Sequence, residues 1–209
     1  MTSQSPRRAL VVIDVQNEYI NGKFRIEYPP VDISLPNIER VMDAATKHNI
    51  PVVVVQHVLP HDAPIFAEGS DGAKLYPAVA ERRHSYLVTK TLPSVFTKTG
   101  FGQWLEENDI DTLTVVGYMT HNCNDSTIRE AMHRGYHVET LHDATGSLPY
   151  KNNAGSATAA EIHRVTLVVM ESAYAAVMST DDWLTGLERG GRFSSDNIYA
   201  SNQRAIGHM

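Results

Sequence analysis

Short apolar runs rich in valine recur along the chain, and they are nearly continuous rather than alternating with polar residues. This pattern is typical of strands that are covered on both faces, as in a parallel sheet. We expect strands at 9–15, 51–56, 86–89 and 112–117, with two weaker ones at 136–141 and 165–169.

Helical patterns fall between these runs. In the segment 34–49 the apolar residues recur on one helical face, and Pro36 is tolerated near the first turn. The other expected helices are 101–108, 120–134, 154–164 and 180–187. Alternating strands and helices, joined by right-handed crossovers, predict an α/β fold. We expect a doubly wound, Rossmann-like three-layer α/β/α arrangement with a mainly parallel six-stranded sheet.

The chain is expected to be one domain over residues 1–209, with a core at about 9–184. The segment 60–83 contains Pro, Gly and Asp without a strong period, so we interpret it as a loop that covers part of a site. The segment 190–209 has little apolar content. It is either a frayed tail or an arm that packs on a neighbouring subunit.

Composition narrows the class of protein. The 209 residues are 42% hydrophobic and 20% charged, which is typical of a globular chain, and the net charge of −6 disfavours a nucleic-acid partner. Apolar runs are too short to cross a bilayer and no secretory signal is expected, so we predict a cytoplasmic protein without a membrane partner. The single cysteine excludes an internal disulfide and a zinc site built from cysteines alone.

Three reactive side chains stand where predicted strands end. Asp14 follows the first strand, Lys90 follows the third, and Cys123 lies in the first turn of the helix after the fourth. In an open parallel sheet, ligands bind outside the carboxyl ends of the strands. Each residue alone has an ordinary interpretation, as a capping acid, a solvated amine or a small buried hydrophobe. The expected convergence of an acid, an amine and a thiol at one edge of the sheet favours a catalytic role over these ordinary interpretations.

The chemistry of this trio is nucleophilic. A thiolate is the attacking form of cysteine, and a helix N-terminus or a neighbouring ammonium lowers the pKa of a thiol. Thr120 is expected to cap the helix, which would place Cys123 near the third helical position. A carboxylate such as Asp14 could take the thiol proton and return it to a leaving amine.

Three motifs in chain order resemble the isochorismatase-like cysteine hydrolases, a superfamily that includes nicotinamidases, N-carbamoylsarcosine amidase, and ureidoacrylate and biuret hydrolases. The resemblance runs from about residue 9 to 184, with further matches at Asp143-Ala144 and 177–184. The motifs are Asp14-x-Gln16, Lys90-x-x-x-Ser94-x-Phe96 and Gly117-x-x-Thr120-x-x-Cys123.

The resemblance implies a function and its machinery. It implies a catalytic triad of Asp14, Lys90 and Cys123, and an oxyanion hole made by the N–H groups of Met119 and Cys123. It also implies a cis peptide bond between Tyr118 and Met119. The implied reaction is hydrolysis of a carbon–nitrogen bond in a small amide, ureido compound or lactam, through a thioester and without a cofactor. The resemblance further suggests a homo-oligomer, either a dimer or a tetramer.

No metal is expected. Nicotinamidases carry an Asp-x-His pair after the second strand, and this sequence has His57 and Leu59 at those positions. The alternative is a metal site of another geometry, built from His57, His61 and Asp62. The substitution weakens a nicotinamidase assignment.

The pocket is predicted from the neighbours of the motifs. Phe66 or Tyr76 could close it from above. Phe96 could equally be core packing, and Gln16 could simply hold Asp14. The candidate substrate-binding residues are Gln16, Phe96, Tyr118, Thr120 and His121.

Three other functions compete with this hypothesis. A vinyl-ether hydrolase of the isochorismatase type does not need the thiol, so retention of Cys123 favours carbon–nitrogen hydrolysis. A non-catalytic small-molecule binding protein of the same fold is disfavoured by the intact trio. A redox module is disfavoured because no second cysteine is present to resolve the first.

Overall fold

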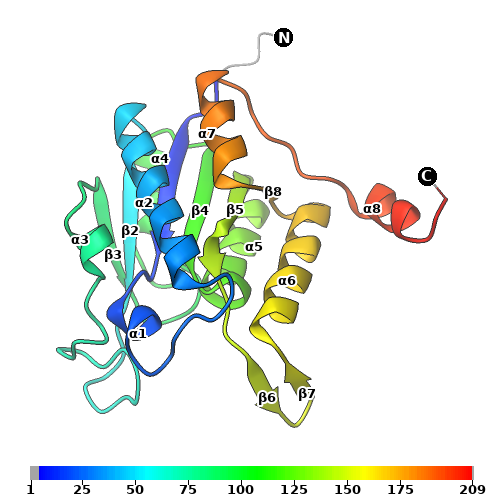
Figure 1. Ribbon diagram of the computed structural model, residues 1–209. Helices are drawn as coiled ribbons and strands as arrows, with labels where there is room; N and C mark the ends of the chain where they lie inside the picture. The colour runs from blue at the N-terminus through cyan, green and yellow to red at the C-terminus, as the bar shows by residue number, and fades with distance from the viewer. Residues whose placement is uncertain (1–4, 209) are drawn as a thin grey trace.

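Six parallel strands form one sheet in the order β3-β2-β1-β4-β5-β8 (Figure 1). The computed structural model describes residues 5–208 of the chain. The strands of the sheet are β1 (Arg8–Ile13), β2 (Val52–His57), β3 (Tyr86–Lys90), β4 (Thr112–Tyr118), β5 (His137–Gly146) and β8 (Ala176–Met178). Every neighbouring pair is parallel, and the order reverses between β1 and β4. The predicted doubly wound fold is confirmed.

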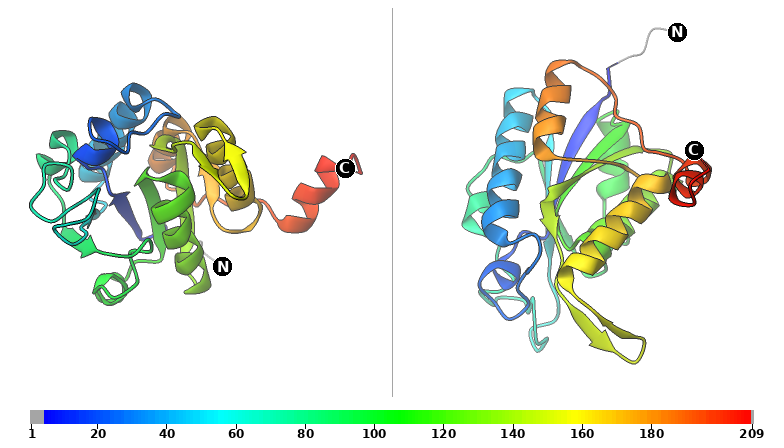
Figure 2. Two further views of the ribbon diagram at one scale, coloured as in Figure 1. Left: turned by 90° about the horizontal axis from the view of Figure 1, so that it is seen from below. Right: turned by 45° about the vertical axis from the view of Figure 1, so that its right-hand side comes forward.

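Helices cover both faces of this sheet, which gives three layers (Figure 2). One face packs against α2 (Val31–Lys47), α3 (Pro77–Ala80) and α7 (Thr180–Glu188). The other packs against α4 (Phe101–Glu107), α5 (Asp125–His133) and α6 (Ala159–Ala173). The side chains of β1 alternate between the two cores, so every position of this strand is buried. Burial on both sides explains why its sequence lacks an apolar–polar alternation.

One predicted strand is wrong. The segment 165–169 lies in the second half of α6, and the sixth strand is the short β8 further along the chain. Thr158 and Glu161 form a reciprocal capping box that begins α6 at residue 159. His163 is buried with Leu167 and Met170, while the three valines of the segment face outward. The helical period therefore overrides the β-branched composition.

The carboxyl edge of the sheet carries the irregular segments. These are α1 (Asn17–Ile20), the loop 58–76, and a hairpin of β6 (Tyr150–Asn152) and β7 (Gly155–Ala157) that projects from the body (Figures 1 and 2). The second strand of the hairpin occupies the start of the helix predicted at 154–164, which begins at residue 159 instead. At the far end of the chain, α8 (Ile198–Ala205) stands away from the body on an extended connection (Figure 1).

Gly117 lets β4 approach β1 closely at this edge. Its φ is +99°, and a Cβ there would lie 2.1 Å from the carbonyl oxygen of Ile13. Only glycine fits such a position without a shift of one strand. The contact brings the segment after β4 next to the segment after β1.

Among residues 5–208, no helix is both long enough and apolar enough to cross a bilayer.

Candidate active site

Asp14, Lys90 and Cys123 meet at the carboxyl edge of the sheet, beside the point where the strand order reverses. The Lys90 ammonium donates to Asp14 Oδ2 at 2.7 Å and to Cys123 Sγ at 3.2 Å. Asp14 is 0% exposed, Lys90 2% and Cys123 4%. Bulk water therefore does not screen these contacts. The structure therefore brings together the three residues that the strand ends predicted.

His57, the last residue of β2, is a fourth member of this cluster. Its Nδ1 lies 3.0 Å from Lys90 Nζ, and the two residues are register partners on neighbouring strands. An ammonium has three donors and no acceptor, so His57 Nδ1 accepts and the imidazole proton sits on Nε2. All three N–H groups of Lys90 are thus used, one each for a carboxylate, an imidazole and a thiol.

One oxygen of Asp14 remains without a partner. Oδ2 is bound to Lys90, while the buried Oδ1 has no hydrogen-bond partner among the described residues. The Asp14 backbone has a positive φ of 52° and its N–H donates to the Val55 carbonyl. Non-glycine residues in this left-handed region concentrate at functional sites. An unpaired carboxylate oxygen next to a thiol is a ready proton acceptor.

The charge states follow from burial and from these neighbours. Burial by itself lowers the pKa of Lys90, but Asp14 and Cys123 outweigh it and the net shift is upward. Burial raises the pKa of the Cys123 thiol, and Asp14 raises it further against the opposing effect of Lys90. The expectation of a lowered thiol pKa is therefore wrong. These two shifts favour an ammonium on Lys90 and a protonated thiol on Cys123.

Cys123 lies in a wide π-helical turn, η1 (Thr120–Asn124), that leads into α5. Thr120 does not cap this turn as predicted, because the capping position is Met119. The Thr120 hydroxyl instead lies 2.9 Å from Thr145 Oγ1 and 2.9 Å from His163 Nδ1. Asn124 Nδ2 donates to the same Thr145 hydroxyl and to the Gly117 carbonyl. This buried network fixes the turn that carries the nucleophile.

The bond between Tyr118 and Met119 is cis, as the resemblance implied. Met119 is buried and lies with Cys123 in the wall of the same cavity. The proposed oxyanion-hole role of their N–H groups stays a prediction.

Cys123 lines a cavity of about 210 Å³. Aromatic and aliphatic side chains form most of its wall, and the loop 58–76 supplies several of them. Phe66 closes the cavity as predicted, whereas Tyr76 packs against the core behind it. The lining residues are Tyr19, Phe24, His57, Leu59, Ile65, Phe66, Thr91, Pro93, Met119, Asn122 and Cys123.

None of the five predicted substrate-binding residues lines this cavity. The Gln16 amide donates to the His57 and Ala73 carbonyls and accepts from the His57 N–H, so backbone groups use both of its ends. Phe96 packs in the core against Phe101. These side chains are already occupied, so the structure does not bring them to the cavity and their role in substrate binding stays a prediction.

The other three predicted residues also point elsewhere. The Tyr118 hydroxyl lies 2.9 Å from Ser34 Oγ, and Thr120 belongs to the network behind the turn. His121 Nδ1 lies 3.0 Å from Ser147 Oγ, and its ring meets Tyr150 edge-on. Of the residues beside the third motif, Met119 and Asn122 line the cavity instead.

Sequence reasoning missed several residues of the site. His57 could have been found, because it ends the second strand and the argument that selected Asp14 and Lys90 applies to it equally. Tyr19, Phe24 and Ile65 carried no such signal. They reach the cavity from α1 and from loops whose conformation no periodicity encodes.

A metal does not fit the residues present. Asp14, His57 and Cys123 offer ligand atoms within 4.8 Å of one another. The Lys90 ammonium, however, is hydrogen-bonded to all three, so a cation already occupies the place between them. The alternative set of His57, His61 and Asp62 does not assemble either, since His61 and Asp62 are exposed in a turn. No step of the chemistry below is assigned to a metal.

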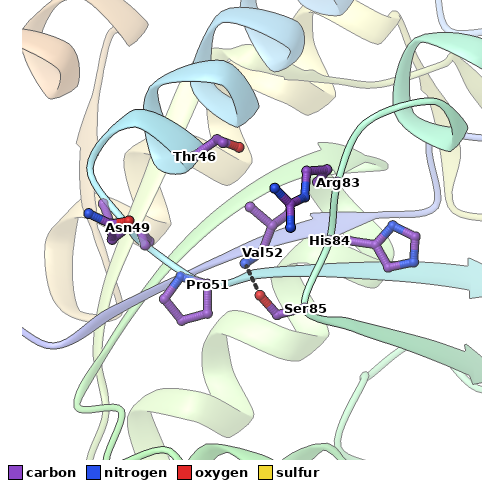
Figure 3. A pocket seen from close by; sticks show the side chains of 8 residues that line it. Thr46, Asn49, Pro51, Val52, Arg83, His84 and Ser85 are labelled. Carbon is purple, nitrogen blue, oxygen red and sulfur yellow. Dashed lines mark hydrogen bonds between the residues drawn. The ribbon is translucent and has the colours of Figure 1, made fainter.

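A second cavity, of about 360 Å³, lies at the opposite, amino edge of the sheet (Figure 3). It is formed where β2 and β3 begin, and Arg83, His84 and Ser85 stand along one side of it (Figure 3). Its open, polar wall contains neither a thiol nor a buried carboxylate. This cavity therefore lacks the thiol and the carboxylate that meet at Lys90.

Comparison with known families gives one domain match. The family model for the isochorismatase domain matches residues 8–182. A candidate isochorismatase from Burkholderia xenovorans, known from its crystal structure, is 57% identical with a TM-score of 0.96, over 97% of this chain and 98% of that one.

Curated relatives agree with this match. A secreted isochorismatase effector of Verticillium dahliae is 30% identical over 181 residues, which is 87% of this chain and 92% of the relative. A ureidoacrylate amidohydrolase of Agrobacterium fabrum is 25% identical over 71% of this chain and 79% of its own length.

Proposed function

The chain belongs to the isochorismatase family of hydrolases, and from this premise we propose that it is a cysteine-dependent hydrolase of carbon–nitrogen bonds. Its substrate is a small amide, ureido compound or lactam, and the reaction passes through a thioester on Cys123. The observation that carries the proposal is the buried cluster in which the Cys123 thiol and the Asp14 carboxylate share the Lys90 ammonium. The relationship to an amidohydrolase of ureidoacrylate supports the same bond type.

The first half of the reaction makes the thioester. Asp14 Oδ1 takes the Cys123 proton as the sulfur attacks the carbonyl carbon, and the negative charge moves to the carbonyl oxygen. The N–H groups of Met119 and Cys123 stabilise that oxygen. When the tetrahedral adduct collapses, the protonated Asp14 gives its proton to the leaving nitrogen, and the carbon–nitrogen bond breaks.

The second half regenerates the enzyme. Asp14, again a carboxylate, takes a proton from a water molecule that attacks the thioester carbonyl. The acid product leaves and the sulfur recovers its proton from Asp14, so protons balance over the cycle. Lys90 keeps the carboxylate in place throughout and stabilises the thiolate whenever it forms.

Substitution of the nucleophile tests the proposal. On any hydrolysed amide, found by a screen of simple amides, ureido acids and lactams, we expect Cys123→Ala to lower kcat by at least about 10³-fold. Mass spectrometry of an acid-quenched wild-type reaction should show the acyl group on Cys123, and hydroxylamine should trap it as a hydroxamate. Full activity of Cys123→Ala would show that the thiol is not the nucleophile.

A further inference from the structure

The wall opposite Cys123 is aromatic. Tyr19 packs against Phe66 with ring centroids 4.9 Å apart and against Phe24 at 6.0 Å. Phe66 also meets the His57 ring edge-on at 5.6 Å. These rings fix one another, so the surface that a substrate meets is built before binding.

The remainder of the wall carries no charge. None of the eleven lining residues is an aspartate, glutamate, lysine or arginine. Leu59, Ile65 and Met119 complete the apolar part, while Thr91 and Pro93 are exposed at its rim. A carboxylate placed among these side chains would find no cation to pair with.

The titratable groups near the cavity add no positive charge to its wall. Burial and the charge of Lys90 lower the pKa of His57, so its imidazole is neutral near pH 7. Burial raises the pKa of Tyr19 well above its ordinary value, so its hydroxyl also stays neutral. Lys90 already pairs with Asp14 at 2.7 Å, and an anionic substrate would have to compete with that carboxylate.

We propose that the part of the substrate held by this cavity is small, uncharged and largely apolar, and that amides carrying a carboxylate there are rejected. This inference rests on the proposed function. The volume of about 210 Å³ lies below the roughly 300–1,000 Å³ typical of pockets for drug-sized ligands. Burying an unpaired carboxylate is strongly unfavourable, whereas an apolar group of equal size gains from leaving water.

Two amides of matched shape test the charge preference in catalysis. In 4-methylpentanamide an isopropyl group stands where succinamate has a carboxylate. We expect kcat/KM for the neutral amide to exceed that for succinamate by about 100-fold or more. An equal or higher value for succinamate would overturn the inference.

Two alkylating reagents test the same preference without turnover. The chain has one cysteine, so any thiol label is on Cys123. The labelling rates with iodoacetamide and with iodoacetate are each divided by the rate with a free thiol at the same pH. We expect the neutral reagent to be favoured by about tenfold or more, also at 0.5 M salt, where the net charge of −6 is screened.

Variants show whether the cavity sets this ratio. Leu59→Arg places a cation in the wall and should bring the two normalised rates within about threefold of each other, whereas the uncharged Leu59→Met should keep the wild-type ratio. Leu87→Arg adds the same charge on the exposed side of β3 and serves as the matched control. A ratio that Leu59→Arg leaves unchanged would overturn the inference.

The outcomes separate this inference from the proposed function. The expected labelling ratio without hydrolysis of any amide would refute the hydrolase and keep the neutral pocket. Hydrolysis through Cys123 with a preference for substrates that carry a carboxylate would support the hydrolase and refute the neutral pocket. If neither reagent labels the folded protein although both label it in denaturant, and no amide is hydrolysed either, the cavity does not admit small ligands and the inference fails.

Discussion

At the scale of single residues, Lys90 holds the site together. Its three donors bind Asp14, His57 and Cys123, so one buried ammonium fixes the proposed base, the proposed nucleophile and a neighbouring imidazole. The carboxylate and the incipient thiolate compete for the same cation. This competition keeps the thiol protonated until a substrate accepts the electrons of the sulfur.

Substitution of the two charged partners should therefore change the thiol in opposite directions. Asp14→Asn removes the carboxylate that raises the thiol pKa, so at pH 8 we expect alkylation of Cys123 to become about tenfold faster while hydrolysis is lost. Lys90→Gln removes the stabilising cation, so alkylation should become slower. The measurement is the rate of iodoacetamide labelling, with circular dichroism to confirm folding. A change of the same sign in both variants would contradict this account.

The three reactive residues of the site could be predicted from the sequence, whereas the residues that line the cavity could not. Asp14, Lys90 and Cys123 follow strands of a parallel sheet, and topology alone brings such residues to one edge. Phe24 and Ile65 line the cavity because of loop conformations that leave no periodic signal. The raised pKa of Cys123 also depends on burial and on a distance to Asp14, which the sequence does not contain.

At the scale of elements, the turn that carries Cys123 depends on α6 and β5. Thr120 lies between Thr145 of β5 and His163 of α6, and Asn124 ties the end of the turn to the same threonine. The capping box of Thr158 and Glu161 sets the start of α6 and thus the position of His163. A helix whose outer face is rich in valine therefore also positions the nucleophile.

His163 should make the stability of the fold depend on pH. Burial lowers its pKa from 6.5 to about 4, so the unfolded chain binds a proton that the folded one excludes. Stability is complete above pH 6.5 and is lost as the pH falls toward 4, by about 2 kcal/mol at pH 5 from this group. In His163→Asn the free energy of unfolding, measured with urea, should fall less between pH 7 and pH 5. Equal losses in both proteins would show that His163 does not titrate in this way.

At the scale of the whole molecule, the chain ends in an arm. Residues 190–196 are tied to the body, through Arg8 to the Gly191 carbonyl and through the N–H of Asp196 to Glu171. Beyond them, α8 has no buried residue, and Ile198 and Tyr199 of the helix and Ile206 just after it are exposed. An isolated helix of this length is not stable in water on its own. A frayed tail would not be expected to form one.

We expect this arm to contact a second copy of the chain, in line with the oligomer that the family resemblance suggested. Light scattering of the full chain should give a multiple of the monomer mass, and deletion of residues 198–209 should lower it. Ser201→Ala, a substitution on α8 that removes no apolar group, is the control and should keep the full mass. A monomeric full-length protein, or an unchanged mass after deletion, would assign α8 to a free tail.

The protonated thiol has a consequence for how long the protein survives. Peroxides attack the thiolate rather than the thiol, and access to the sulfur limits them further. Cys123 is buried and its pKa is raised, so between turnovers the sulfur is a poor target for oxidants. In the proposed mechanism it becomes a strong nucleophile only when a substrate fills the cavity, and the acyl group then shields it. An enzyme with a single cysteine can thus keep that cysteine reduced without a second thiol to repair it.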